Sequence, residues 1–174
     1  MSWLFFVAAT LVIALDQITK KVVAATFLPG ESRIVVPHVF WLTYVQNHKG
    51  AFGLFGGHPL FMAAIALGVV VIFYSWYRQD GANAATHLIF GLILGGAIGN
   101  IIDRLRFGYV VDFFDLHWWP VFNVADSAIS IGIASLLLTI VFHDRRRRAM
   151  AAPPASSAEA LAPENAGPQG PALH

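Results

Sequence analysis

The chain contains four apolar runs, each close to the length that crosses a lipid bilayer. They lie at about residues 3–27, 59–77, 87–103 and 123–142. A transmembrane helix needs roughly 20 residues. Charged residues make up only 12% of the chain, which is low for a soluble globular domain. The runs therefore predict an all-α membrane protein with four transmembrane helices.

The first apolar run is predicted to be a retained span and not a secretory signal peptide. No basic residue precedes it, and Asp16, Lys20 and Lys21 interrupt it where a signal peptide stays neutral. The whole chain is short enough for a single domain.

Composition and motif content exclude several kinds of chemistry. The net charge of +1 argues against a nucleic acid partner. The chain has no cysteine, which excludes disulfides, thiolate metal sites, a cysteine nucleophile and a cysteine-linked lipid. Its seven histidines do not follow metal-ligand spacing, and no serine lies in a Gly-x-Ser-x-Gly elbow. We therefore expect no metal.

The two longer connections between spans are predicted to lie on the outer face. Residues 28–58 contain two β-rich apolar segments, which predict a small sheet between helices 1 and 2. Trp41 and Tyr44 in this sheet suit the membrane interface. Residues 104–122 carry the Trp118-Trp119 pair and are predicted to form a short interfacial segment.

Orientation is predicted from the arginines at 145–148, which directly follow the last span. Such clusters mark the cytoplasmic side, although the lysines and arginines elsewhere nearly balance this signal. We expect a four-helix domain over residues 1–148. The Ala- and Pro-rich tail at 149–174 is expected to be disordered and cytoplasmic.

Glycines at 91, 95 and 99 share one face of the third span. This spacing favours close packing of another helix. A nucleotide-binding loop is not expected there, because the glycines follow no strand.

Two aspartates lie in strongly apolar sequence. Asp126 begins the fourth span, and Asp112 is flanked by two valines and two phenylalanines. A carboxylate at membrane depth is costly unless a partner or water compensates it, so such residues indicate function. If the two converge at one membrane surface, they favour acid/base chemistry on a peptide bond.

Three polar pairs each share a helix face because their members are three or four residues apart. These pairs are Asn100 with Asp103, Asn123 with Asp126, and Asp16 with Lys20. The first two pairs flank the same connection and are expected on the same side of the membrane. Asp16 and Lys20 are expected to form an ion pair with each other and to have a structural role.

Each polar group also has a plainer interpretation. Asn123 can cap the fourth helix, with Asp126 completing a capping box. Asp103 can form an interfacial ion pair with Arg104. Asp115 is expected to be a loop carboxylate in water.

Two other function classes fit parts of the pattern. A proton or ion transporter could use Asp16, Asp103 and Asp126 as a relay, although these groups gather near one surface. A membrane scaffold could use the glycine face, but it leaves Asp112 and Asp126 unexplained.

Five segments, in order, resemble the motifs of lipoprotein signal peptidase, the bacterial signal peptidase II. They are DQITK at 16–20, NHKGAFG at 47–53, GGAIGNIIDR at 95–104, GYVVDF at 108–113 and FNVADSAI at 122–129. One motif differs from the family. The family usually reads Asn-x-Gly-Ala-Ala-Phe, and this chain has Lys49 at the position of the first glycine.

The resemblance implies an intramembrane aspartyl endopeptidase with Asp112 and Asp126 as its catalytic dyad. Its substrate would be a prolipoprotein whose cysteine carries diacylglycerol, and cleavage would occur just before that cysteine. The implied location is the outer face of the bacterial cytoplasmic membrane, in contact with lipid. We expect a monomer without a cofactor. Supporting or substrate-positioning roles are implied for Asp16, Lys20, Asn47, Asn100, Asp103, Arg104 and Asn123.

Local sequence suggests different roles for the two aspartates. Asp126 lies in the first turn of a helix, where the dipole favours the anion, so we expect it to be the base. Apolar neighbours favour the protonated form of Asp112, which we expect to be the acid. An apolar groove for acyl chains is expected along Phe52, Phe113, Phe114, Trp118 and Trp119.

Overall fold

A computed structural model describes residues 3–48, 67–68, 71–72, 75 and 83–151, with side chains described up to residue 142. The chain divides into two compact units, Met1–Leu138 and Thr139–His174. The features described below all belong to the first unit, apart from the last turns of α4. The elements are α1 (Trp3–Thr26), β1 (Ser32–Val36), β2 (Phe40–Asn47), α3 (Ala84–Phe107), β3 (Val110–Asp115) and α4 (Val124–Ala151).

Three helices in the described part of the chain are long and apolar enough to cross a membrane. They are α1, α3 and the Val124–Phe142 segment of α4. The protein is thus mostly helical, as predicted. The predicted span at 59–77 falls mainly outside the described residues, although Leu67, Gly68, Val71, Ile72 and Ser75 are helical. The count of four spans stays a prediction, and most of the predicted tail also lies outside the described residues.

Helix α3 is longer at both ends than the predicted 87–103 span because both ends are capped. Asn83 is the N-cap, and its side chain accepts a hydrogen bond from the Thr86 N–H. At the other end Gly108 has φ +78°, and its N–H bonds to the Arg104 carbonyl. Glycine adopts this left-handed conformation without steric cost. The apolar pattern marked the buried part of the helix, and the caps set its ends.

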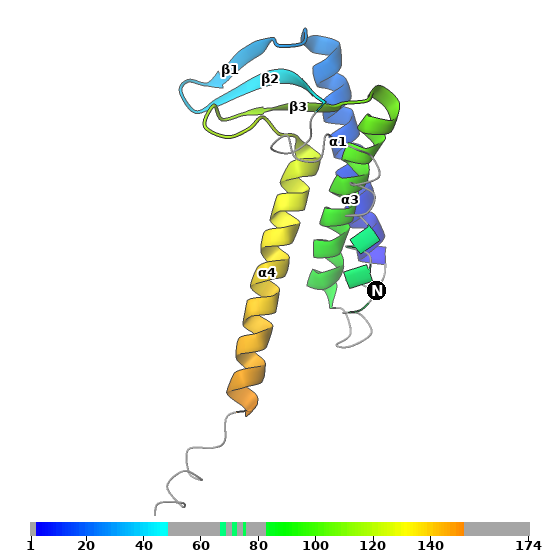
Figure 1. Ribbon diagram of the computed structural model, residues 1–174, viewed down its shortest axis with the longest axis vertical. Helices are drawn as coiled ribbons and strands as arrows, with labels where there is room; N and C mark the ends of the chain where they lie inside the picture. The colour runs from blue at the N-terminus through cyan, green and yellow to red at the C-terminus, as the bar shows by residue number, and fades with distance from the viewer. Residues whose placement is uncertain (1–2, 49–66, 69–70, 73–74, 76–82, 152–174) are drawn as a thin grey trace, which may run out of the picture. The chain divides into compact units, whose positions relative to one another are not determined.

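The sheet has three antiparallel strands in the order β1-β2-β3. The predicted pair between the first two spans forms β1 and β2. The prediction for residues 104–122 was wrong, because they contribute strand β3 and not merely an interfacial segment. Strand β3 pairs along β2, with Asp112 opposite Val45 and Val110 opposite Asn47. In Figure 1 the sheet lies across the ends of α1 and α3 and beside the beginning of α4.

Glycines let α3 approach helices on two sides. A Cβ on Gly91 would lie 2.7 Å from Ala8 Cβ, and one on Gly95 would lie 2.7 Å from the Ala9 carbonyl oxygen of α1. On the other side, a Cβ on Gly96 would collide with the Ala125 carbonyl oxygen of α4. The predicted packing role of the glycine face is therefore confirmed, and it places the end of α3 between α1 and α4.

Substitution of Gly96 by alanine is expected to destabilise the protein by about 1–3 kcal/mol, because overpacking at a backbone contact forces helices apart. The nearest obstructing atom is the backbone carbonyl oxygen of Ala125, which a rotamer change cannot move. Leu105→Ala is the matched control on α3, since Leu105 is 71% exposed. Thermal unfolding in detergent measures both. Equal unfolding temperatures for the two variants would contradict this packing.

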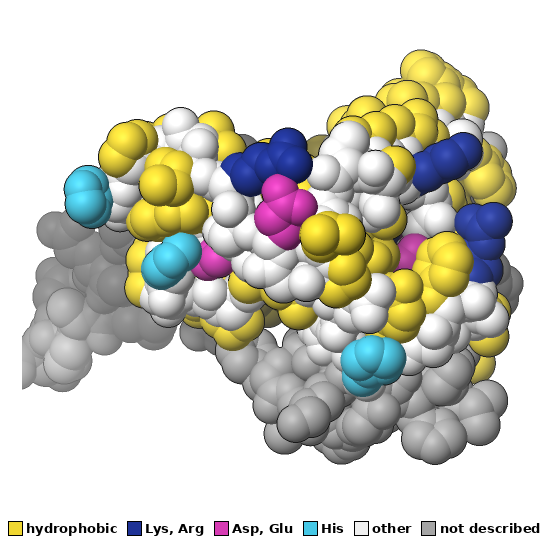
Figure 2. Space-filling model, turned by 90° about the horizontal axis from the view of Figure 1, so that it is seen from above, with side chains coloured by type: hydrophobic (Ala, Val, Ile, Leu, Met, Phe, Trp, Pro, Cys, Tyr) yellow, Lys and Arg dark blue, Asp and Glu magenta, His cyan; other side chains and the backbone are white. Residues whose placement is uncertain are grey.

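Burial is inverted relative to a water-soluble protein. Large apolar side chains cover the outside of the helices, as Phe6 (63% exposed) and Leu138 (58%) illustrate, whereas Asp16 and Asn123 are fully buried. Figure 2 looks onto the sheet end and shows hydrophobic side chains interspersed with basic, acidic and histidine side chains. A lipid environment accounts for the apolar exterior. The polar interior needs another explanation, which the site provides.

Candidate active site

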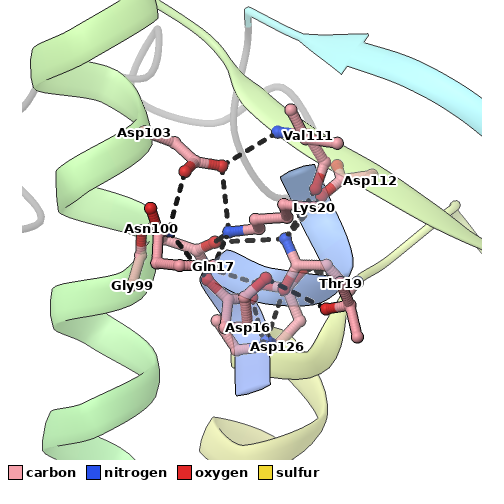
Figure 3. Close-up of polar contacts among 12 residues, drawn as sticks. Asp16, Gln17, Thr19, Lys20, Gly99, Asn100, Asp103, Val111, Asp112 and Asp126 are labelled. Carbon is pink, nitrogen blue, oxygen red and sulfur yellow. Dashed lines mark hydrogen bonds and ion pairs between the residues drawn. The ribbon is translucent and has the colours of Figure 1, made fainter. Parts of the chain in front are cut away.

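A cluster of buried charged and amide side chains lies where α1, α3, β3 and α4 meet (Figure 3). Lys20 is 3% exposed, and its Nζ lies 2.8 Å from Asp16 Oδ2 and 3.0 Å from Asp103 Oδ2. The predicted Asp16–Lys20 pair is confirmed. The alternative in which Asp103 forms an ion pair with Arg104 is wrong, because Asp103 pairs with Lys20 of α1. A cation between two carboxylates compensates charge at membrane depth.

Both carboxylates also bind backbone N–H groups of other elements. The Ala125 N–H donates to Asp16 Oδ1 at 3.0 Å, and the Val111 N–H donates to Asp103 Oδ2 at 3.1 Å. Ala125 lies in the first turn of α4, where free N–H groups and the helix dipole attract an anion. These bonds attach the start of α4 to α1 and attach β3 to α3.

Gln17 is a further member of the cluster that the sequence interpretation missed. Its Nε2 donates to Asp103 Oδ1 at 2.9 Å and to the Gly99 carbonyl at 3.2 Å. The signal was present, because Gln17 lies three residues before Lys20 and therefore on a related face of the same helix. Gln17 and the Val111 N–H therefore bind different oxygens of the Asp103 carboxylate.

Asn100 of α3 links the ion cluster to Asp126. Its Oδ1 accepts hydrogen bonds from Lys20 Nζ at 3.0 Å and Asn123 Nδ2 at 3.1 Å. Its Nδ2 donates to Asp126 Oδ1 at 2.8 Å. The predicted Asn100–Asp103 and Asn123–Asp126 pairs thus meet in one network.

Asn123 contacts both of the predicted dyad aspartates. Its Oδ1 accepts from the Asp126 N–H at 2.9 Å, and its own N–H donates to Asp126 Oδ2 at 3.3 Å. This is the reciprocal capping box that its spacing suggested. Its Nδ2 also donates to Asp112 Oδ1 at 2.7 Å. Capping therefore describes only half of what Asn123 does.

Asp112 lies on β3 and is 2% exposed. In addition to Asn123, it accepts a hydrogen bond on Oδ2 from Asn47 Nδ2 at 2.8 Å. Burial raises the pKa of Asp112 to about 7, and the negative charge of Asp126 acts in the same direction. The hydrogen bonds from Asn47 and Asn123 and the charge of Lys20 oppose this shift in its pKa. Asp112 therefore titrates near neutrality.

Arg104 is the second buried cation of the region, with 8% exposure. The charges of Asp126, Asp112 and Asp103 act on its guanidinium. Its Nη1 lies 3.4 Å from the Asn100 carbonyl oxygen, a long contact. Arg104 thus adds positive potential beside the three aspartates without a direct ion pair to any of them.

Asp115 is not the water-exposed loop carboxylate that was predicted. It ends β3, and its side chain accepts from Thr43 Oγ1 at 2.7 Å and from the His117 N–H at 2.8 Å. Burial acts to raise the pKa of Asp115, but these bonds and the His117 ring bring it below its ordinary value. Its partners are separate from those of Asp112, so Asp115 belongs to the sheet.

Most of the predicted site residues converge in this cluster. Phe52 and Lys49 lie outside the described residues. Phe113 was predicted to line the groove for acyl chains, but it is 2% exposed and packs in the sheet core. Within the described part of the chain, no group of His, Asp or Glu side chains is arranged to hold a metal ion. Asp112, which is buried, and Asp126, which is partly buried, share Asn123 as a neighbour. Two such carboxylates can hold one proton between them and supply both an acid and a base.

The model of the family described as signal peptidase (SPase) II matches residues 8–142. A protein named lipoprotein signal peptidase from Syntrophomonas wolfei subsp. wolfei is 46% identical over 145 residues, with 82% of this chain and 95% of the relative covered. The chain belongs to the signal peptidase II family. A second lipoprotein signal peptidase, from Halothermothrix orenii, is 43% identical over 133 residues, covering 76% of this chain and 92% of the relative.

Solved structures support the same assignment of this signal peptidase II. One, described as a bacterial membrane enzyme determined by the in meso method at 2.3 Å, has a TM-score of 0.71 and 31% identity, covering 79% of this chain and 87% of that chain. Another of the same description at 1.9 Å has a TM-score of 0.68 and 31% identity, covering 78% of this chain and 91% of that chain. The family predicted from the five motifs is confirmed. The chain is therefore a protease of a bacterial membrane.

Proposed function

We propose that this signal peptidase II is an aspartyl endopeptidase that removes the signal peptide from diacylglyceryl-modified prolipoproteins. It cleaves before the lipidated cysteine at the outer face of the cytoplasmic membrane, as a monomer. The curated relatives are named lipoprotein signal peptidases, which supports the substrate class. The observation that carries the aspartyl mechanism is that Asn123 binds Asp112 through its side chain and Asp126 through its backbone and cap.

The proposed reaction uses the two carboxylates in different protonation states. Asp126 accepts a proton from water as the oxygen attacks the scissile carbonyl carbon. Asp112 donates its proton to the carbonyl oxygen, which gives a neutral tetrahedral diol. Proton transfer from Asp126 to the amide nitrogen then accompanies cleavage of the C–N bond, while Asp112 recovers its proton from the diol. Each such acid–base step contributes typically about 10²–10⁴-fold to the rate.

The surrounding residues fit supporting roles in this reaction. Asn47 and Asn123 hold the two oxygens of Asp112, which fixes the direction of its carboxyl plane. Asn100 holds Asp126 by donating from its Nδ2 to Asp126 Oδ1. Arg104 supplies positive potential where negative charge develops on the substrate carbonyl. Asp16, Lys20 and Asp103 hold the elements that carry these groups.

The acid role of Asp112 predicts how activity depends on pH. Its pKa is raised to about 7, so the protonated form that donates to the carbonyl predominates below that value. We expect kcat/KM to fall as pH rises through about 7, and to fall also at the acidic pH at which the Asp126 base becomes protonated. Steady-state cleavage across the pH range measures this, because kcat/KM reports groups of the free enzyme. An increase through neutrality would reverse the assigned roles.

The substrate class is tested with matched precursors that carry or lack diacylglycerol on the cysteine. Buried acyl chains contribute on the order of 0.8 kcal/mol per CH₂, and remote binding energy of this kind can position a scissile bond. We therefore expect the unmodified precursor to lose kcat as well as affinity with the purified enzyme in detergent. Equal kcat and KM for the two precursors would contradict the proposed substrate.

A further inference from the structure

All three N–H donors of the Lys20 ammonium have an acceptor. An ammonium group has three N–H donors and no acceptor. The three acceptors are Asp16 Oδ2 at 2.8 Å, Asp103 Oδ2 at 3.0 Å and Asn100 Oδ1 at 3.0 Å. A buried ion pair with a purely structural role accounts for the two carboxylates. It does not account for the third bond, which goes to a neutral amide.

That third bond determines which way the Asn100 amide faces. Because Lys20 can only donate, the atom of Asn100 that faces it must be the carbonyl oxygen, and the second contact from Asn123 Nδ2 requires the same. The Nδ2 of Asn100 is then directed at Asp126 Oδ1, 2.8 Å away. Figure 3 shows the side chains of Lys20, Asp103 and Asn100 pointing toward one another, with Asp126 below them.

We propose that Lys20 is a positioning residue that acts through Asn100, fixing its amide so that Asp126 receives an N–H donor and not a carbonyl oxygen. An N–H donor pairs with an ionised carboxylate, which is the form that a base needs. An amide turned by 180° would present its oxygen and pair with a protonated acid instead. This inference rests on the proposed function and specifies how the base of that same site is maintained.

Lys20 can hold the Asn100 amide in this orientation because the two carboxylates that bind its ammonium are themselves held by other hydrogen bonds. Asp16 is bound by the Ala125 N–H, and Asp103 is bound by Gln17 and the Val111 N–H. The chain of contacts therefore runs from α1 through Asn100 of α3 to Asp126 of α4. In the described structure Lys20 makes no hydrogen bond or ion pair with Asp112 or Asp126, yet it bonds to Asn100, which holds Asp126.

The first test is a double-mutant cycle on the full chain with Lys20→Met and Asn100→Leu. Each single change removes the donor to Asp126, or its orientation, and is expected to lower kcat by about 10- to 100-fold with KM for the lipidated precursor little changed. Because both act through one hydrogen bond, the double variant should be no slower than Asn100→Leu alone. Effects that multiply, or a loss confined to KM, would overturn the inference.

Two further variants keep the test decisive where Lys20→Met fails to fold. The double variant Lys20→Met/Asp103→Asn preserves the net charge of the cluster. Its kcat is compared with the kcat of Asp103→Asn alone. Asn100→Asp retains an oxygen for Lys20 but offers no N–H to Asp126, so it should lose kcat as Asn100→Leu does. Normal kcat in Asn100→Asp overturns the inference. Normal turnover after loss of Asp112 or Asp126 would instead remove the proposed function itself.

Discussion

Replacing either Asp112 or Asp126 with asparagine is expected to lower kcat/KM for the lipidated precursor by at least about 10²–10⁴-fold while the protein remains folded. Each change removes one proton donor or acceptor from the reacting groups, and general acid–base steps have this size. Asparagine is close to aspartate in volume and keeps a hydrogen-bonding oxygen. The fold should therefore survive, although Asp112 is buried and Asp126 is partly buried.

Asp115→Asn is the matched control for this experiment. It lies on the same strand as Asp112, and its side chain bonds to Thr43 and His117. Asparagine can still accept the Thr43 hydroxyl hydrogen, so turnover should stay near that of the unmodified enzyme. Cleavage by each purified variant, together with its unfolding temperature, measures the difference. Normal turnover by Asp112→Asn or Asp126→Asn would exclude the dyad.

The second large effect is expected at Asn123, where serine separates capping from catalysis. Serine is a good N-cap, so Asn123→Ser should retain the bond to the Asp126 N–H and most of the stability of α4. It cannot also donate to Asp112 and Asn100 as the longer amide does. Leaving these buried acceptors unsatisfied costs about 1–3 kcal/mol, which corresponds to a loss of about 5- to 150-fold in kcat.

Asn123→Ala completes the comparison, because it removes the cap as well. It should show a similar loss of activity and an additional loss of about 1 kcal/mol in the free energy of unfolding. Chemical or thermal unfolding in detergent separates the two variants, and precursor cleavage compares their rates. If Asn123→Ser cleaves at the normal rate, Asn123 is only a helix cap, and its hydrogen bond to Asp112 has no role in catalysis.

Contacts between residues close in sequence could be predicted because helix geometry alone determines them. The Asp16–Lys20 pair follows from a separation of four residues, and the Asn123–Asp126 capping box follows from a separation of three. Apolar length likewise predicted three helices that the structure describes as candidate spans. The glycine spacing on the third run predicted where another helix could approach. Each of these depends on one helix and its period.

The tertiary structure decided which of these local groups meet. Asp103 pairs with Lys20 across 83 residues of chain, and the Asn47–Asp112 bond joins residues 65 apart. The alternative Asp103–Arg104 pair is absent from the described structure, because close packing at the α3 glycines brings the Lys20 ammonium of α1 within reach of Asp103. Strand β3 also could not be read from residues 104–122, since a strand depends on the register of its partner β2.

The sequence by itself determined a membrane protein with carboxylates in apolar surroundings, because hydropathy and helix period are properties of short segments. The ordered motifs also determined its family. Only the tertiary structure decided that Asp112 and Asp126 share Asn123, and that Lys20 reaches Asp126 through Asn100. The physical reason is that a strand register and two helix contacts must form together before these four elements can place their side chains within hydrogen-bonding distance.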